Sequence, residues 1–118
     1  MSIRILCVDD NAPLLTTRKL LLSRLGYDVL TATNAEDARS LFRSTAIDLA
    51  IVDYHLPGML GDELCMELKE MQPHVRTILV SGSYPDHDCE CGVDQFVLKG
   101  QSPAILMQAI TTLTKQAA

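Results

Sequence analysis

Apolar residues along the chain alternate between short continuous runs and stripes of helical spacing. The continuous runs predict buried strands at residues 3–8, 27–32, 49–52, 75–80 and 95–98. The stripes predict helices at residues 11–25, 35–44, 62–70 and 103–115. Strands and helices that alternate in this way favour an α/β fold, in which right-handed crossovers place helices on both faces of a parallel sheet.

The stripes also predict which helical residues face the core. For the first and last helices these are Leu14, Leu21, Leu22 and Leu25, and Ile105, Leu106, Ile110 and Leu113. For the two middle helices they are Ala38, Leu41 and Phe42, and Leu64, Cys65 and Leu68. Either Asp10 or Asn11 is suited to cap the first helix, and residues 55–61, with one proline and two glycines, read as a loop.

Residues 83–92 carry no apolar stripe, so we expect a very short helix or none between the last two strands. His87, Cys89 and Cys91 in this segment are of the residue types that bind zinc. Their spacing is not that of a C-x-x-C pair and a fourth ligand is not evident, so a solvated loop is the favoured interpretation.

Length and composition set the class of protein. A chain of 118 residues with 47% hydrophobic residues forms one domain, residues 1–118, with an aliphatic core, since aromatic residues make up only 4%. The net charge of −5 argues against a nucleic-acid surface. The first residues do not resemble a signal peptide and no apolar run is long enough to span a membrane, so we expect a cytoplasmic protein without a membrane partner.

Polar residues follow four of the five predicted strands directly. They are Asp9 and Asp10, Asp53, Ser81 and Lys99. The carboxyl ends of parallel strands lie at one edge of a sheet, where such folds bind ligands, so these groups are expected to share one site. Carboxylates held close together repel one another, and Mg²⁺, which prefers oxygen ligands, would relieve that repulsion.

The residues alone leave several roles open. Asp53 could be a third metal ligand or a nucleophile that attacks phosphorus. Asp9 and Asp10 could instead form a solvated turn, and Ser81 could simply end its strand. The Lys99 ammonium could offset the carboxylate repulsion or bind a phosphoryl group.

Taken together and in order, these residues resemble the receiver domain of bacterial two-component response regulators over the whole chain. Asp9 and Asp10 match the acidic pair of that family, and the sequence DYHLPGMLG (residues 53–61) is similar to its phospho-acceptor loop. Ser81 followed by a small residue, and then Lys99, complete the pattern. The resemblance implies a flavodoxin-like doubly wound sheet of five parallel strands in the order 2-1-3-4-5.

The resemblance also implies roles. Asp53 would accept a phosphoryl group from a histidine kinase or a histidine phosphotransfer protein, and the chain would act as a signalling switch toward a downstream protein partner, not as an enzyme. Asp9, Asp10, Asp53 and the backbone carbonyl of His55 would bind Mg²⁺, with Mn²⁺ as an alternative. Ser81 and Lys99 would bind the phosphoryl oxygens, and Phe96 would couple to Ser81 as part of the switch.

Two departures from the family pattern bear on the output. Gly100 stands where the family usually has proline, so we expect a trans peptide bond or a strained one. The segment between Ser81 and Lys99 is shorter than usual where the family has its fourth helix, a region that often mediates dimerisation, so a homodimer stays open.

Two other functions remain as alternatives. One is a phosphorylation-independent scaffold with the receiver fold. The other is a metal-dependent phosphatase in which His55 would serve as the acid or base; in the switch, the same imidazole could act on the acyl phosphate or simply be an exposed loop residue.

Overall fold

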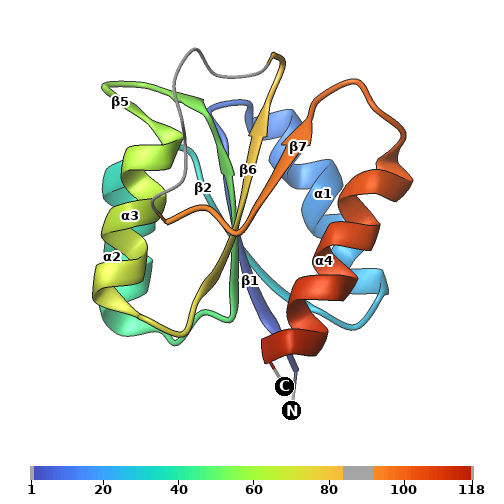
Figure 1. The fold of residues 1–118 in the computed structure, drawn as a ribbon, viewed down its shortest axis with the longest axis horizontal. Helices are drawn as coiled ribbons and strands as arrows, with labels where there is room; N and C mark the ends of the chain where they lie inside the picture. The colour runs from blue at the N-terminus through green and yellow to red at the C-terminus, as the bar shows by residue number, and fades with distance from the viewer. Residues whose placement is uncertain (1, 84–91, 118) are drawn as a thin grey trace.

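The computed structural model describes residues 2–83 and 92–117 and is built on one parallel sheet (Figure 1). Its strands are β1 (Arg4–Val8), β2 (Asp28–Ala32), β3 (Leu49–Asp53), β6 (Arg76–Ser81) and β7 (Gln95–Leu98). They lie in the order β2-β1-β3-β6-β7, and all neighbours are parallel. Because β6 and β7 are the fourth and fifth strands of this sheet, the predicted order 2-1-3-4-5 is confirmed.

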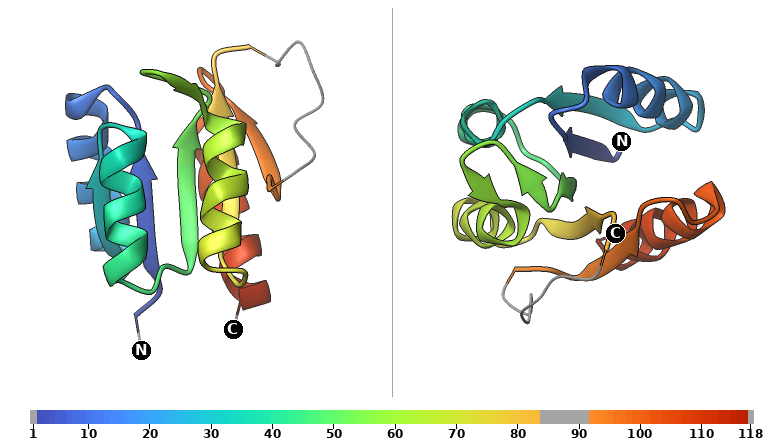
Figure 2. Two further views of the ribbon diagram at one scale, coloured as in Figure 1. Left: turned by 90° about the vertical axis from the view of Figure 1, so that its left-hand side faces the viewer. Right: turned by 90° about the horizontal axis from the view of Figure 1, so that it is seen from above.

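The helices cover both faces of the sheet. They are α1 (Ala12–Arg24), α2 (Ala35–Ser44), α3 (Gly61–Met71) and α4 (Pro103–Ala117), each within two residues of its predicted bounds. Figures 1 and 2 show α2 and α3 together on one face and α1 and α4 on the other. Within the described part of the chain, no helix has the length and apolar character needed to cross a membrane.

Two apolar layers hold the helices to the sheet. One lies under α2 and α3 and includes Ala38, Phe42 and Leu64, and the other lies under α1 and α4 and includes Leu22 and Ile110. Strand β3 is buried at every position, as expected for the centre of a sheet covered on both faces. Each fully buried Leu or Ile side chain in these layers stabilises the fold by about 1.5–3 kcal/mol.

The predicted inner faces of α1 and α4 were wrong in part. Leu22 is buried, but Leu21 and Leu25 are 51% and 61% exposed, and Leu15 takes their place in the core. In α4, Ile105 is 42% exposed. Adjacent leucines point about 100° apart on a helix, so a leucine-rich sequence such as that of α1 fits more than one inward face.

The segment after β3, predicted as a loop, is in fact a hairpin. Strands β4 (His55–Leu56) and β5 (Met59–Leu60) pair antiparallel. Gly58, between them, has φ +80°, a conformation that glycine adopts without steric cost. The buried Leu56 packs in the core under α3 and so anchors the hairpin. The sequence did not reveal this hairpin because its apolar residues form only a short pattern that a turn interrupts.

Two predictions concern the chain around β7. The described peptide bonds are trans, including that between Lys99 and Gly100, and Gly100 has φ +86°. The prediction of a short or absent helix within 83–92 falls mainly on residues 84–91, which lie outside the described residues.

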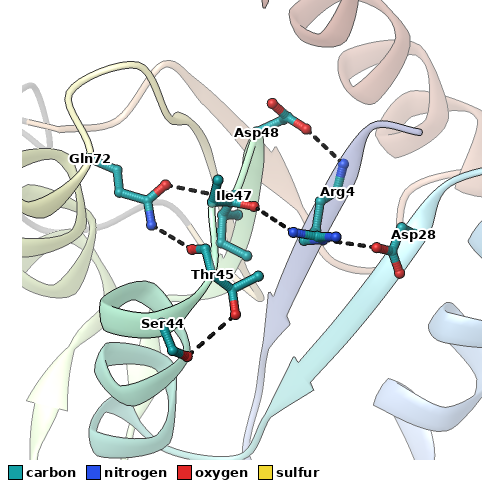
Figure 3. Close-up of polar contacts among 8 residues, drawn as sticks. Arg4, Asp28, Ser44, Thr45, Ile47, Asp48 and Gln72 are labelled. Atoms are coloured by element: carbon teal, nitrogen blue, oxygen red, sulfur yellow. Dashed lines mark hydrogen bonds and ion pairs between the residues drawn. The ribbon is translucent and has the colours of Figure 1, made fainter. Parts of the chain in front are cut away.

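Polar groups at the amino-terminal edge of the sheet form hydrogen bonds and an ion pair with one another (Figure 3). Arg4 donates from Nε to Asp28 Oδ2 at 2.8 Å, and its backbone N–H donates to Asp48 Oδ2 at 2.8 Å. Gln72 accepts from Ile47 N at 2.9 Å and donates to Thr45 O at 2.7 Å. Side chains at this edge therefore supply hydrogen-bond partners for nearby backbone groups and one ion pair.

A close backbone approach fixes the chain beyond β3. A Cβ atom on Gly61 would lie 2.2 Å from the backbone oxygen of Asp53 and 2.9 Å from a methyl of Leu79. Gly61 N donates to Tyr54 O at 2.7 Å, and Tyr54 N donates to Val80 O at 2.8 Å. The start of α3 is thus pressed against the residue that ends β3, and only glycine fits there.

Gly61→Ala should therefore destabilise the protein by about 1–3 kcal/mol, because the backbone must move to admit the methyl group. Gly82→Ala is the matched control, since its Cβ would meet nothing within 4 Å, and we expect a change within about 0.5 kcal/mol. Urea denaturation of the two variants checks this. Equal effects of the two substitutions would contradict the packing described at Gly61.

Candidate functional site

Three carboxylates meet at the carboxyl-terminal edge of the sheet. Asp9 and Asp10 follow β1 and Asp53 ends β3, two neighbouring parallel strands. One oxygen from each lies within 4.8 Å of the other two. Asp9 and Asp53 are buried, at 1% and 5% exposure, while Asp10 is exposed. The sequence prediction that strand ends bring these carboxylates together is therefore correct.

The turn after β1 holds Asp9 in place. Asp9 N donates to Ala32 O at 3.1 Å, and its Oδ1 accepts from Asn11 N at 2.9 Å. Asn11 is the residue that caps α1, because its Oδ1 accepts from Leu14 N at 3.1 Å. Of the two candidate caps, the structure uses Asn11, and the Asp10 carboxylate is left at the exposed rim of the cluster.

Lys99 faces the two buried carboxylates. Its Nζ lies 3.2 Å from Asp53 Oδ1 and 3.4 Å from Asp9 Oδ2. Its backbone N–H donates to Ser81 O at 2.7 Å, which extends the pairing of β7 with β6 up to the site. One ammonium group therefore serves two buried carboxylates at once.

The electrostatics of the cluster are not balanced by this lysine. Burial raises the pKa of Asp53 and the charge of Asp9 raises it further, and the hydrogen bond and charge of Lys99 lower it only in part. Burial lowers the pKa of Lys99, but the hydrogen bond and charge of Asp53, together with Asp9, outweigh this and raise it overall. A further positive charge would thus stabilise the ionised cluster.

The remaining predicted residues lie on or near the same edge. Ser81 ends β6, next to β3, and is fully buried; its Oγ accepts from Ser83 N at 3.4 Å. Phe96 lies on β7, partly buried against the core under α3. His55 is exposed and its ring meets that of Tyr54 edge-on at 4.9 Å between centroids. The structure brings Asp9, Asp10, Asp53 and Lys99 together. The roles of all the predicted site residues stay predictions.

The donor atoms of the cluster suit a hard divalent cation. Carboxylate oxygens are the ligands that Mg²⁺ and Mn²⁺ take in proteins. The two described cysteines do not compete for such an ion: burial raises the pKa of Cys7 and of Cys65 to about 12, so both remain thiols inside the core.

Two residues that shape the site were not recognised as such from the sequence. Asn11 orders both Asp9 and the start of α1, and Gly61 lets α3 approach the backbone of Asp53. The sequence indicated Asn11 as a candidate helix cap. Its contact with Asp9 could not be predicted, because that contact depends on the conformation of the turn after β1. Gly61 ends the motif of residues 53–61, but its tight contact arises between segments and does not follow from that motif.

Comparison with known proteins decides the family. The family model for the response regulator receiver domain matches residues 5–111. The chain belongs to this family. Its sheet order and the carboxylate cluster at the ends of β1 and β3 agree with that assignment.

Relatives and solved structures support this receiver domain assignment. The transcriptional regulatory protein AruR of Pseudomonas aeruginosa is 33% identical over 96% of the chain and 50% of its own length. A CheY-like receiver domain protein from Methanospirillum hungatei superposes with a TM-score of 0.91 at 29% identity, covering 98% of this chain and 97% of that one.

The response regulator TrrA of Thermotoga maritima has been solved in two complexes. In complex with Mg²⁺-BeF it matches with a TM-score of 0.85 at 30% identity, covering 94% of this chain and 98% of TrrA. In complex with the histidine kinase ThkA it matches with a TM-score of 0.83 at 31% identity, covering 94% and 97%.

The receiver domain spans about half the length of the curated relatives it matches. Several of those relatives are transcriptional regulators. Membership of the family makes this chain a signalling module of two-component systems.

The imbalance of charge predicts an unusual stabilising substitution. The pKa of Asp53 is raised in the folded state, so its contribution to stability falls as pH rises from the unfolded pKa through the folded one, and stays lowered at neutral pH. Asp53→Asn should therefore stabilise the metal-free protein at pH 7 by on the order of 1 kcal/mol.

Urea denaturation at pH 7 in EDTA measures this effect, and Asp28→Asn is the control because Asp28 is paired with Arg4. The control should give no stabilisation. Adding Mg²⁺ should raise the stability of the wild type more than that of Asp53→Asn, since the ion binds the folded cluster. A metal-free Asp53→Asn protein that is less stable than the wild type would refute the charge imbalance.

Proposed function

We propose that this receiver domain accepts a phosphoryl group on Asp53, in a Mg²⁺-dependent reaction, from a histidine kinase or a histidine phosphotransfer protein. The observation that carries the proposal is the placement of Asp53, which ends the central strand in a cluster with Asp9 and Asp10 and lies 3.2 Å from Lys99 Nζ. Such a protein would act in the cytoplasm.

The metal would be held by Asp9, Asp10 and Asp53, with the backbone carbonyl of His55 as a further ligand. When bound, Mg²⁺ supplies positive charge to the transferring phosphoryl oxygens. Mn²⁺ prefers the same ligands and is expected to substitute for it. The complex of TrrA with Mg²⁺-BeF supports this assignment by similarity.

Asp53 is the proposed nucleophile because it begins the segment, residues 53–61, that is similar to the phospho-acceptor loop of the receiver family. In the transfer, an oxygen of Asp53 forms a bond to phosphorus while the bond from phosphorus to the donor histidine nitrogen breaks, and its electron pair returns to that imidazole. Lys99 and the hydroxyl of Ser81 would bind the transferred oxygens.

The change of charge at Asp53 would then act as the switch. A phosphorylated Asp53 would draw Lys99 and Ser81 toward its new oxygens, and Phe96 would follow Ser81 from its partly buried position on β7. Gly100, with φ +86°, follows Lys99 directly and gives the chain after β7 a conformation that other residues rarely adopt. The surface around β7 would present the result to a downstream protein.

A groove beside Lys99 suits the approach of the phosphodonor protein. It has a volume of about 340 Å³ and is lined mainly by apolar side chains of α1 and α4, among them Leu21 and Leu106. Because it runs up to Lys99 and Gly100, a protein docked there would reach the phosphorylation site. The complex of TrrA with the histidine kinase ThkA supports a kinase as that partner.

Intact-mass spectrometry with acetyl phosphate or phosphoramidate tests the proposal without a kinase. With Mg²⁺, we expect one phosphoryl adduct that hydroxylamine removes, because an acyl phosphate is labile to that nucleophile. EDTA should abolish the adduct, and Asp53→Asn should not form it. A folded wild-type protein that stays unmodified at saturating donor and Mg²⁺ would reject phosphorylation and favour a constitutive scaffold.

A further inference from the structure

An ionic cluster fixes the chain where it enters β7. Asp94, one residue before the strand, accepts from Lys69 Nζ of α3 at 2.7 Å and lies 3.6 Å from Nη1 of Arg76 on β6. Its side chain is only 19% exposed. Burial raises the pKa of Asp94, but Lys69 and the N–H of Thr77 lower it more, so the carboxylate is ionised at neutral pH.

Backbone contacts reinforce this cluster. Thr77 N donates to Asp94 Oδ2 at 2.8 Å, and Asp94 N donates to Thr77 O at 3.1 Å. The hydroxyl of the fully buried Thr77 also donates to Gly92 O. A Cβ on Gly92 would lie 2.7 Å from the backbone of Met66, so the chain here is pressed against α3.

This anchoring matters for Lys99 because β7 is an edge strand of the described sheet. It pairs with β6 alone, in a register that sets Gln95 opposite Ile78 and Leu98 opposite Ser81. Lys99 directly follows the strand, and its N–H continues the ladder to Ser81 O. A slip of one residue along β6 would turn every side chain of β7 to the opposite face of the sheet.

We propose that Asp94 is a positioning residue for the phosphoryl-transfer site, which fixes the register of β7 so that the Lys99 ammonium reaches Asp53. This inference rests on the proposed function for its catalytic consequence. The structural part concerns only Asp94, β6 and Lys99. Asp94 acts through Lys99 and contacts neither Asp53 nor the carboxylates that would bind Mg²⁺.

Two substitutions test the proposal from opposite sides of the ion pair. Asp94→Asn removes the charge but keeps an acceptor for Thr77 N, and Lys69→Gln removes the partner on α3. Asp28→Asn is the matched control, since Asp28 begins the other edge strand, β2, and is likewise paired with an arginine. The distance from Asp28 Oδ2 to Arg4 Nε is 2.8 Å. The Lys69 variant keeps the test informative if Asp94→Asn does not fold.

The first readout is amide hydrogen exchange. In Asp94→Asn and Lys69→Gln we expect the N–H of Lys99 and those of β7 to exchange about tenfold faster, because a charged hydrogen bond that holds the strand is lost. Amides of β1 and β3 should stay protected as in the wild type. Asp28→Asn should leave the Lys99 amide unchanged.

The second readout compares two quantities in each variant: the rate of phosphorylation by acetyl phosphate and the affinity for Mg²⁺. We expect the rate to fall about tenfold in Asp94→Asn while Mg²⁺ binds with an affinity within about twofold of wild type, since the carboxylates are untouched. In a Lys99→Met background, Asp94→Asn should cause no further loss of rate, because both changes remove the same ammonium. A general loss of structure would instead lower the rate again in that background.

The outcomes separate the two claims. Wild-type protection of the Lys99 amide in both variants would overturn the proposal, as would a loss of rate that persists in the Lys99→Met background. A wild-type protein that is folded but not phosphorylated would reject the proposed function and with it the role of Asp94 in the reaction. Faster exchange at Lys99 in the variants would in that case still show that Asp94 holds β7 against β6.

Discussion

The repulsion among the carboxylates at the carboxyl-terminal edge of the sheet is the constraint on which the site depends. At the opposite edge, the guanidinium of Arg4 pairs with Asp28 while Asp48 accepts the backbone N–H of Arg4, so each of these carboxylates has a donor of its own. At the carboxyl-terminal edge, two buried aspartates share the single ammonium of Lys99. Burial without full compensation raises the pKa of Asp53, and the same imbalance makes the edge receptive to a cation.

The fold holds these carboxylates close together although they repel one another. Parallel strands buried on both faces bring the ends of β1, β3, β6 and β7 to one edge, and apolar burial supplies the stability that the charges remove. Local contacts then set each group: Asn11 orients Asp9, Gly61 allows α3 to approach Asp53, and the proposed role of Asp94 is to fix the register that delivers Lys99. The stability of the fold thereby holds the carboxylates together in spite of their repulsion.

Much of this could be predicted from the sequence because the relevant signals are local. Continuous apolar runs gave the strands, and a polar residue directly after a strand implied a position on one edge. The face of α1 was wrong because its leucines point in several directions, and the β4-β5 hairpin was missed because its strands are short. The ion pair of Asp94 with Lys69 joins residues distant in sequence, and such contacts depend on how the whole chain packs.

The most direct test of the charge imbalance is a carbon-13 NMR titration of the Asp53 carboxyl group, with and without Mg²⁺. The account predicts a pKa above the usual range for aspartate in the metal-free protein, and a pKa displaced downward when Mg²⁺ is added, because the cation favours the ionised form. An Asp53 carboxyl group that titrates at the ordinary value and does not respond to Mg²⁺ would contradict the account.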